Sequence, residues 1–114
     1  MKAVKLDQWH PVCSTSDLVP DSGICALVDG QQVAIFMIRS APPAIYAIGN
    51  WDPAGKANVL SRGITADIGG ELTVASPLYK QHFSLSSGQC LEDETLSVPV
   101  FGISLDGDNV MVKV

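Results

Sequence analysis

Short apolar segments that end at tight-turn residues recur along this chain, and they limit what it can fold into. The clearest example runs from Ile24 to Val28, through Asp29-Gly30, and on from Gln31 to Ile38. An Asp-Gly pair favours the type I′ turn that joins two antiparallel strands. The pattern therefore predicts a β-hairpin, and Ala44 to Ile48 is expected to be the next strand.

Three further hairpins are predicted in the same way, around turns at Gly69-Gly70, Ser86 to Gly88, and Asp106 to Asn109. Their strands are, in chain order, Ile64 to Ile68, Glu71 to Ala75, His82 to Leu85, Gln89 to Leu91, Val98 to Leu105 and Val110 to Val114. Only Thr15 to Leu18 has the character of a short helical turn, with Ser14 or Thr15 as its cap. The chain is thus expected to be an all-β antiparallel sandwich or small barrel.

One stretch, Gly49 to Gly63, resists assignment to a strand. It opens with Asn-Trp-Asp-Pro-Ala-Gly-Lys-Ala-Asn, which is turn chemistry, and it is longer than the usual hairpin connection. We interpret it as either a functional loop or a disordered one.

Composition narrows the class of protein. No repeat, low-complexity tract or polar linker interrupts residues 1–114, so a single domain is predicted. A net charge of −5, with seven Lys and Arg residues spread along the chain, argues against a nucleic-acid partner. No apolar run approaches the roughly 18 residues that cross a bilayer, so no membrane partner is expected. Three cysteines without CxxC spacing favour reduced thiols in the cytoplasm.

Candidate acid–base groups are few. His10 and His82 are considered because histidine as a residue type is the usual acid–base group, but neither has a nucleophile or an orienting carboxylate at a motif spacing. No serine stands in a G-x-S-x-G context, and no helix follows Gly69-Gly70 to receive a phosphate. The acidic run Glu92-Asp93-Glu94 is expected to be a solvated turn, or else a contact for a basic partner. No catalytic residue is therefore predicted.

Four stretches carry a family pattern: Asn50 to Pro53, Val59 to Gly63, Ala75 to Phe83, and Leu85 to Glu94. Together they make up about a quarter of the chain, all within residues 50–94. They resemble the small subunit of NAD(P)H-dependent nitrite reductase, and the Val-Leu-Ser-Arg-Gly and Ala-Ser-Pro-Leu runs are the most specific of them. The resemblance implies a Rieske-like fold.

In Rieske ferredoxins a Cys-x-His and a Cys-x-x-His motif together bind a [2Fe–2S] cluster. In register with these motifs, this chain has Asn50 and Asp52 and, after the 23 residues 53–75, Ser76 and Tyr79. Amide, carboxylate, hydroxyl and phenol oxygens are poor substitutes for thiolates and imidazoles on these irons. The resemblance thus implies a Rieske-like antiparallel β-sandwich that lacks the cluster and holds no other metal or cofactor.

The same resemblance implies the biological role. This chain would be the accessory, non-catalytic small subunit of a cytoplasmic nitrite reductase, an oxidoreductase that reduces nitrite to ammonium in nitrate assimilation. Its partner, the large subunit, would carry the siroheme, the [4Fe–4S] cluster, the FAD and the NAD(P)H site. Two alternatives are a Rieske-type ferredoxin that carries electrons and a cluster-less β domain that binds a small ligand.

The resemblance also predicts where the partner binds. In Rieske proteins two loops hold the cluster and meet redox partners, and they correspond here to Asn50 to Gly63 and Ser76 to His82. Trp51 is the candidate aromatic anchor, while Arg62 and Lys80 are candidates to pair with carboxylates of the large subunit.

Overall fold

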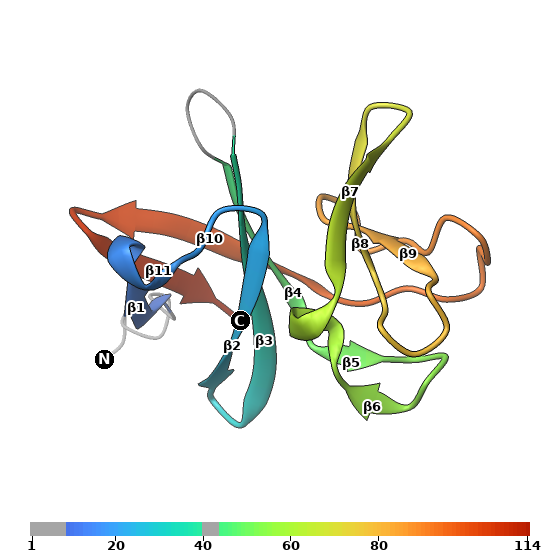
Figure 1. Cartoon of the computed structure of the whole chain (residues 1–114). Helices are drawn as coiled ribbons and strands as arrows, with labels where there is room; N and C mark the ends of the chain where they lie inside the picture. The colour runs from blue at the N-terminus through green and yellow to red at the C-terminus, as the bar shows by residue number, and fades with distance from the viewer. Residues whose placement is uncertain (1–8, 40–43) are drawn as a thin grey trace.

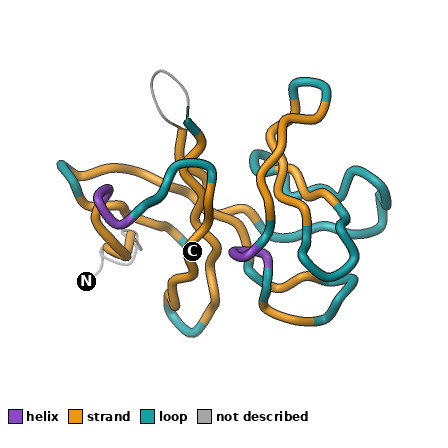
Figure 2. Tube along the Cα trace, in the orientation of Figure 1, coloured by secondary structure: helices purple, strands orange, loops and turns teal. Residues whose placement is uncertain are grey.

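Nearly all regular structure in this chain is β-strand (Figures 1 and 2). The computed structural model describes residues 9–39 and 44–114. The larger sheet has six antiparallel strands in the order β1-β11-β10-β4-β3-β2. Their bounds are β1 Trp9–Ser14, β2 Ser22–Val28, β3 Gln31–Ile38, β4 Ala44–Gly49, β10 Val100–Asp106 and β11 Asn109–Lys113.

A smaller part of the fold is inserted between β4 and β10. It contains a three-stranded antiparallel sheet in the order β7-β8-β9 and a two-stranded ribbon, β5-β6. The bounds are β5 Trp51–Asp52, β6 Ala57–Asn58, β7 Ile64–Ile68, β8 Glu71–Ala75 and β9 His82–Ser84. Two short 3₁₀ turns, η2 (Thr15–Asp17) and η3 (Leu60–Arg62), complete the described structure. In Figure 1 the three-stranded sheet stands beside the six-stranded sheet.

Strand β3 is buried on both faces and joins the two parts of the fold. Val33 and Ile35 belong to a core cluster to which all six strands of the larger sheet contribute. Ala34, Phe36 and Ile38 face the other way, into a second cluster with residues of β8 and β9. Because neighbouring side chains on a strand point to opposite faces, burial of both faces explains the uninterrupted apolar run in this strand.

The expected all-β antiparallel architecture is confirmed. The predicted turns have the positive φ of a type I′ pair: 51° at Asp29 and 80° at Gly30, and 59° at Gly69 and 91° at Gly70. The C-terminal hairpin is also confirmed, although its strands reach further and leave a turn of only Gly107 and Asp108. The helical turn before β2 is present, with Ser14 as its cap.

The predicted hairpin from His82 to Leu91 is correct only in its first strand. Cys90 makes a single bridge to Phe83, whereas its neighbour Gln89 bridges to Ser97. Because adjacent residues pair with two different segments, no continuous second strand forms there.

Four further elements, β1, β5, β6 and η3, were not predicted. Strand β1 contains Pro11, and its pairing with β11 shifts register between Pro11 and Cys13, which breaks the alternation that marks a strand. The long stretch from Gly49 to Gly63 is built from β5, β6 and η3 and is not disordered.

The three cysteines are not paired with one another: Cys90 is buried, Cys13 is partly buried and Cys25 is exposed. Within the described ranges no helix has both the length and the apolar character needed to cross a membrane.

Candidate functional site

The two loops predicted to meet a partner lie at the same end of the smaller part (Figure 1). We call residues 50–63 and 76–82 together the loop end. The first loop runs from the end of β4 through the β5-β6 ribbon to η3, and the second connects β8 to β9.

The turn that begins at Asp52 is closed by its own backbone and side chain. The N–H of Ala54 donates to Oδ1 of Asp52 at 2.9 Å, which is the geometry of an Asx turn. The N–H of Lys56 donates to the carbonyl oxygen of Asp52 at 2.7 Å. Lys56 has a φ of 57°, so the chain reverses through a left-handed residue.

The turn that begins at Ser76 has the same design. The N–H of Leu78 donates to Oγ of Ser76 at 3.2 Å, and the N–H of Lys80 donates to the carbonyl oxygen of Ser76 at 3.0 Å. Lys80 has a φ of 60°. Both turns share the pattern polar residue, proline, two residues and lysine, so the second loop repeats the geometry of the first.

A direct hydrogen bond joins the two turns at their first residues. Oγ of Ser76 donates to Oδ2 of Asp52, and both side chains are buried. A Cβ atom at Gly55 would lie 2.4 Å from Cδ1 of Leu78 and 2.9 Å from Oδ2 of Asp52, so the Leu78 side chain packs directly over the backbone there. The two turns therefore contact each other directly, through this hydrogen bond and through the Leu78 side chain.

Asn50, the first predicted ligand position, is also fully engaged. Its Nδ2 donates to Oε1 of Gln32 at 3.0 Å and contacts Sγ of Cys25 at 3.5 Å. Its Oδ1 accepts the N–H of Ser61 at 2.7 Å. The buried amide therefore fixes the entry to the first loop against β2, β3 and η3.

The residues at the four predicted ligand positions do not fit a [2Fe–2S] cluster. Asn50, Asp52 and Ser76 are buried in hydrogen bonds to their neighbours, while Tyr79 is 68% exposed and stands apart from them. Within residues 9–39 and 44–114, no group of three or more His, Cys, Asp and Glu side chains could hold a metal ion. The chemistry of this site is that of a hydrogen-bonded support for two loops.

The candidate interface residues lie on the surface of the loop end. Trp51 is 49% exposed, and Arg62 and Lys80 are exposed as well. Arg62 and Lys80 line the same surface pocket, whereas Trp51 lines another. Sequence reasoning missed further exposed residues at this end, namely Lys56, Ile64 just beyond it, Leu78 and Tyr79. The repeated pattern of proline followed three residues later by lysine was the available signal for Lys56.

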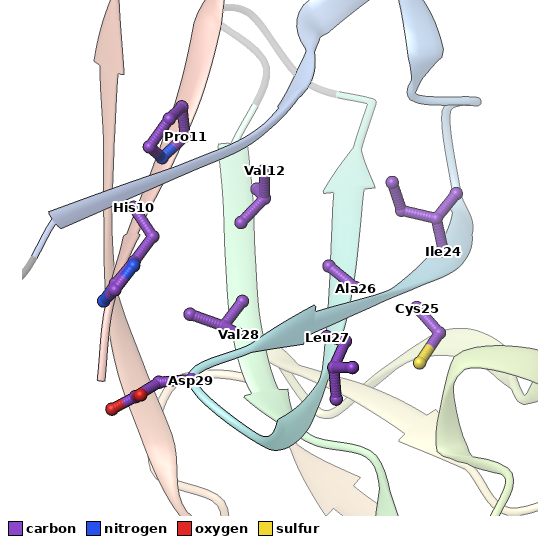
Figure 3. A pocket seen from close by; sticks show the side chains of 9 residues that line it. All are labelled: His10, Pro11, Val12, Ile24, Cys25, Ala26, Leu27, Val28 and Asp29. Atoms are coloured by element: carbon purple, nitrogen blue, oxygen red, sulfur yellow. The ribbon is translucent and has the colours of Figure 1, made fainter.

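The two histidines have different surroundings. His10 lines a groove between β1 and β2, where it faces Asp29 across the gap in Figure 3. His82 instead bonds to Glu92 of the acidic run. Its backbone N–H donates to Oε1 of Glu92 at 2.7 Å, and its ring Nδ1 lies 2.6 Å from Oε2. Glu92 is therefore a structural partner of β9, which corrects the expectation of a purely solvated turn.

Burial raises the pKa of the Glu92 carboxyl, but the hydrogen bonds from the backbone and ring of His82, with the charge of that ring, outweigh it and leave the pKa below its usual value. Asp93 is similar, because the hydroxyl and N–H of Thr95 bond to its carboxylate and lower its pKa.

These shifts predict a pH dependence of stability. A carboxyl whose pKa is lowered by folding stabilises the fold above its unfolded pKa of about 4.3, and this contribution is lost as the pH falls through the lower folded value. Glu92→Gln should therefore destabilise the protein by about 0.2–1 kcal/mol at pH 7 and by less at pH 3. Thermal melts of the wild type and of Glu92→Gln between pH 3 and pH 7 measure this difference in stability, with Glu94→Gln as the control. Parallel curves for wild type and Glu92→Gln would contradict the assignment.

Comparison with known proteins agrees with the geometry. The family described as Rieske-like [2Fe–2S] domain matches residues 8–113. The ferredoxin of carbazole 1,9a-dioxygenase from Nocardioides aromaticivorans superposes with a TM-score of 0.78 over 93% of this chain and 97% of that chain. At 22% identity this likeness concerns the fold alone. Fold and site together define a Rieske-like domain with non-ligand residues at its ligand positions.

More similar proteins define the family within that class. The small subunit of NADH nitrite reductase from Salmonella typhimurium is 50% identical over 93 residues, which are 82% of this chain and 85% of that protein. A structure described as an NADH-dependent nitrite reductase small subunit from Mycobacterium tuberculosis has a TM-score of 0.86 at 40% identity, over 91% of this chain and 92% of that one. The chain belongs to the family of nitrite reductase small subunits, which confirms the resemblance in its sequence.

A further relative has a different length. The large subunit of NAD(P)H nitrite reductase from Klebsiella oxytoca is 34% identical over 104 residues, which are 91% of this chain and 11% of that protein. That large subunit therefore contains a segment related to most of this chain.

Proposed function

We propose that this chain is the accessory small subunit of an NADH- or NADPH-dependent nitrite reductase and that it acts by binding the large subunit. The observation that supports this proposal most strongly is the hydrogen bond between the turns that begin at Asp52 and Ser76. Asp52 and Ser76 are buried and bonded to each other, so the two loops are held in place without iron. The four positions that would hold the cluster carry no thiolate or imidazole ligand, yet both loops are kept in place. Loops that are kept without a cluster are suited to binding a partner protein.

The Klebsiella relative supports the choice of partner. A segment related to this chain occurs there inside a nitrite reductase large subunit, so both parts work within one polypeptide in that organism. Two chains whose relatives are joined in one protein are expected to contact each other when they are separate.

The loop end is the surface that we propose for this contact. Exposed aromatic and aliphatic side chains here are those of Trp51, Leu78 and Tyr79. The basic residues of the loop end are Lys56, Arg62 and Lys80. Asp52 is its one acid and is buried, so the loop end has a net charge of 3 − 1 = +2 in a chain of net charge −5. Apolar anchors among charges opposite to those of the partner are typical of specific interfaces.

The remaining features of the proposed enzyme follow from this role. Siroheme, [4Fe–4S] cluster, FAD and the NAD(P)H site belong to the large subunit, and this chain is non-catalytic. A cytoplasmic location suits its three free thiols. Residues 1–114 act as one domain, since β3 contributes to both core clusters.

The two alternatives receive less support from the geometry. A Rieske ferredoxin needs thiolate and imidazole ligands, whereas the described positions hold an amide, a carboxylate, a hydroxyl and an exposed phenol. A small ligand between the turns would have to displace Leu78 from Gly55 and break the bond between Asp52 and Ser76.

Co-expression of the tagged chain with its siroheme-containing large subunit under anaerobic conditions tests the proposal. We expect the two to co-elute, and we expect the chain expressed alone to contain no stoichiometric iron or labile sulfide and to show no NADH-dependent nitrite reduction. A chain that elutes alone, or that shows the visible absorbance of a Rieske centre, would contradict it.

A further inference from the structure

A surface pocket flanks the loop end beside the three-stranded sheet. Its volume is about 410 Å³, within the range of small-ligand sites. Ile64, Ala75 and Pro77 form apolar parts of its lining. Arg62 and Lys80 reach it from the two different loops.

The pocket concentrates positive charge in an acidic chain. Arg62, Lys80 and His82 all line it, and no Asp or Glu does. Neither Arg62 nor Lys80 takes part in an ion pair among the described residues, while His82 has its Nδ1 against Glu92. Two cations are thus held without counter-charges next to apolar surface.

Two other hollows among the described residues lack this combination. The groove between β1 and β2 includes Asp29 together with His10 (Figure 3). The hollow beside β7 and Arg39 includes Asp21 and Asp67, and Asp21 already pairs with Arg39 at 4.0 Å. The pocket of Arg62 and Lys80 therefore differs in charge as well as in position.

We propose that this pocket receives an acidic side chain, with an apolar neighbour beside it, from the large subunit. An Arg guanidinium and a Lys ammonium on two sides of a recess can bind one carboxylate, and the apolar lining can cover the neighbouring side chain. The inference rests on the proposed function, because the occupant is a segment of that partner. Charge complementarity favours it, since an acidic segment would be repelled by most of the rest of this chain.

Titration of the purified large subunit with single variants at low salt tests the pocket. Arg62→Gln and Lys80→Gln should each weaken binding about tenfold, and raising the salt should weaken the wild type more than either variant. Ala75→Leu, which narrows the pocket without a change of charge, should also weaken binding about tenfold. Thermal melts check that each variant is folded. If Ala75→Leu does not fold, Arg62→Gln and Lys80→Gln are the test.

Three variants each remove one positive charge outside the pocket. Arg39→Gln and Lys113→Gln lie outside the loop end and are the matched controls, so they should stay within about threefold of wild type. Lys56→Gln lies within the loop end but does not line the pocket, so it should weaken binding less than Arg62→Gln or Lys80→Gln. If Lys56→Gln weakens binding as much as Arg62→Gln and Lys80→Gln do, the binding depends on the overall charge of the loop end and not on the pocket. That result would overturn the inference. If the wild type binds and Arg62→Gln and Lys80→Gln bind equally well, the inference is wrong but the proposed function stands. If the wild type does not bind, both the inference and the proposed function are wrong.

Discussion

Replacing Asp52 by alanine is expected to lower the free energy of unfolding by about 2–4 kcal/mol. The Asp52 carboxylate accepts the hydroxyl of Ser76 and the N–H of Ala54, and its side chain is buried. A buried donor that loses its acceptor costs about 1–3 kcal/mol, and here the buried hydroxyl of Ser76 and the partly buried N–H of Ala54 both lose it. The loss should be measured by urea denaturation, with Asp106→Ala on the exposed surface of β10 as the control.

The cross-loop bond itself can be isolated by a double-mutant cycle. Asp52→Ala, Ser76→Ala and the double variant should show a coupling energy of about 1–3 kcal/mol, because the two side chains bond directly. Coupling below about 0.5 kcal/mol, with a loss for Asp52→Ala no larger than that of the control, would mean that the turns are held together by other contacts.

Replacing Trp51 by alanine is expected to weaken binding of the large subunit by about 30-fold or more, which corresponds to about 2 kcal/mol. The indole lies on β5 at the loop end and is 49% exposed, so its truncation removes apolar surface that the fold itself does not fully use. Buried tryptophans are frequent anchors of protein interfaces. Isothermal titration of the variant against the large subunit gives the affinity directly.

The control for Trp51 is another exposed apolar residue remote from the loop end. Leu105 on β10 is 52% exposed and lies beside the C-terminal turn. Leu105→Ala should bind with wild-type affinity. Equal affinities for Trp51→Ala and wild type, when both proteins melt at the same temperature, would move the interface away from the indole.

The strands were predictable wherever local turn chemistry decides the structure. Asp29-Gly30 and Gly69-Gly70 specify type I′ turns, and the strands on either side follow from them. Strand β1 was missed because Pro11 and a register shift hide its alternation, although its partner β11 was identified. The segment after Gly88 was mistaken for a strand because its adjacent residues Gln89 and Cys90 bridge to two different segments, at Ser97 and at Phe83.

The candidate site was predictable in its chemistry but not in its contacts. The sequence alone shows that Asn50, Asp52, Ser76 and Tyr79 are poor iron ligands. The bond between Asp52 and Ser76 joins residues 24 positions apart, so it exists only once β5 and β8 have been brought together. The exposure of Tyr79 likewise depends on the turn from Ser76 to Lys80, within which it lies.

Amide hydrogen exchange of this chain, free and saturated with the large subunit, tests the central claim most directly. Docking through the loop end should slow exchange in residues 50–63 and 76–82 and leave β10, β11 and the groove between β1 and β2 unchanged. Protection confined to those other elements, or no change anywhere at saturation, would contradict the claim that the loop end is the docking surface.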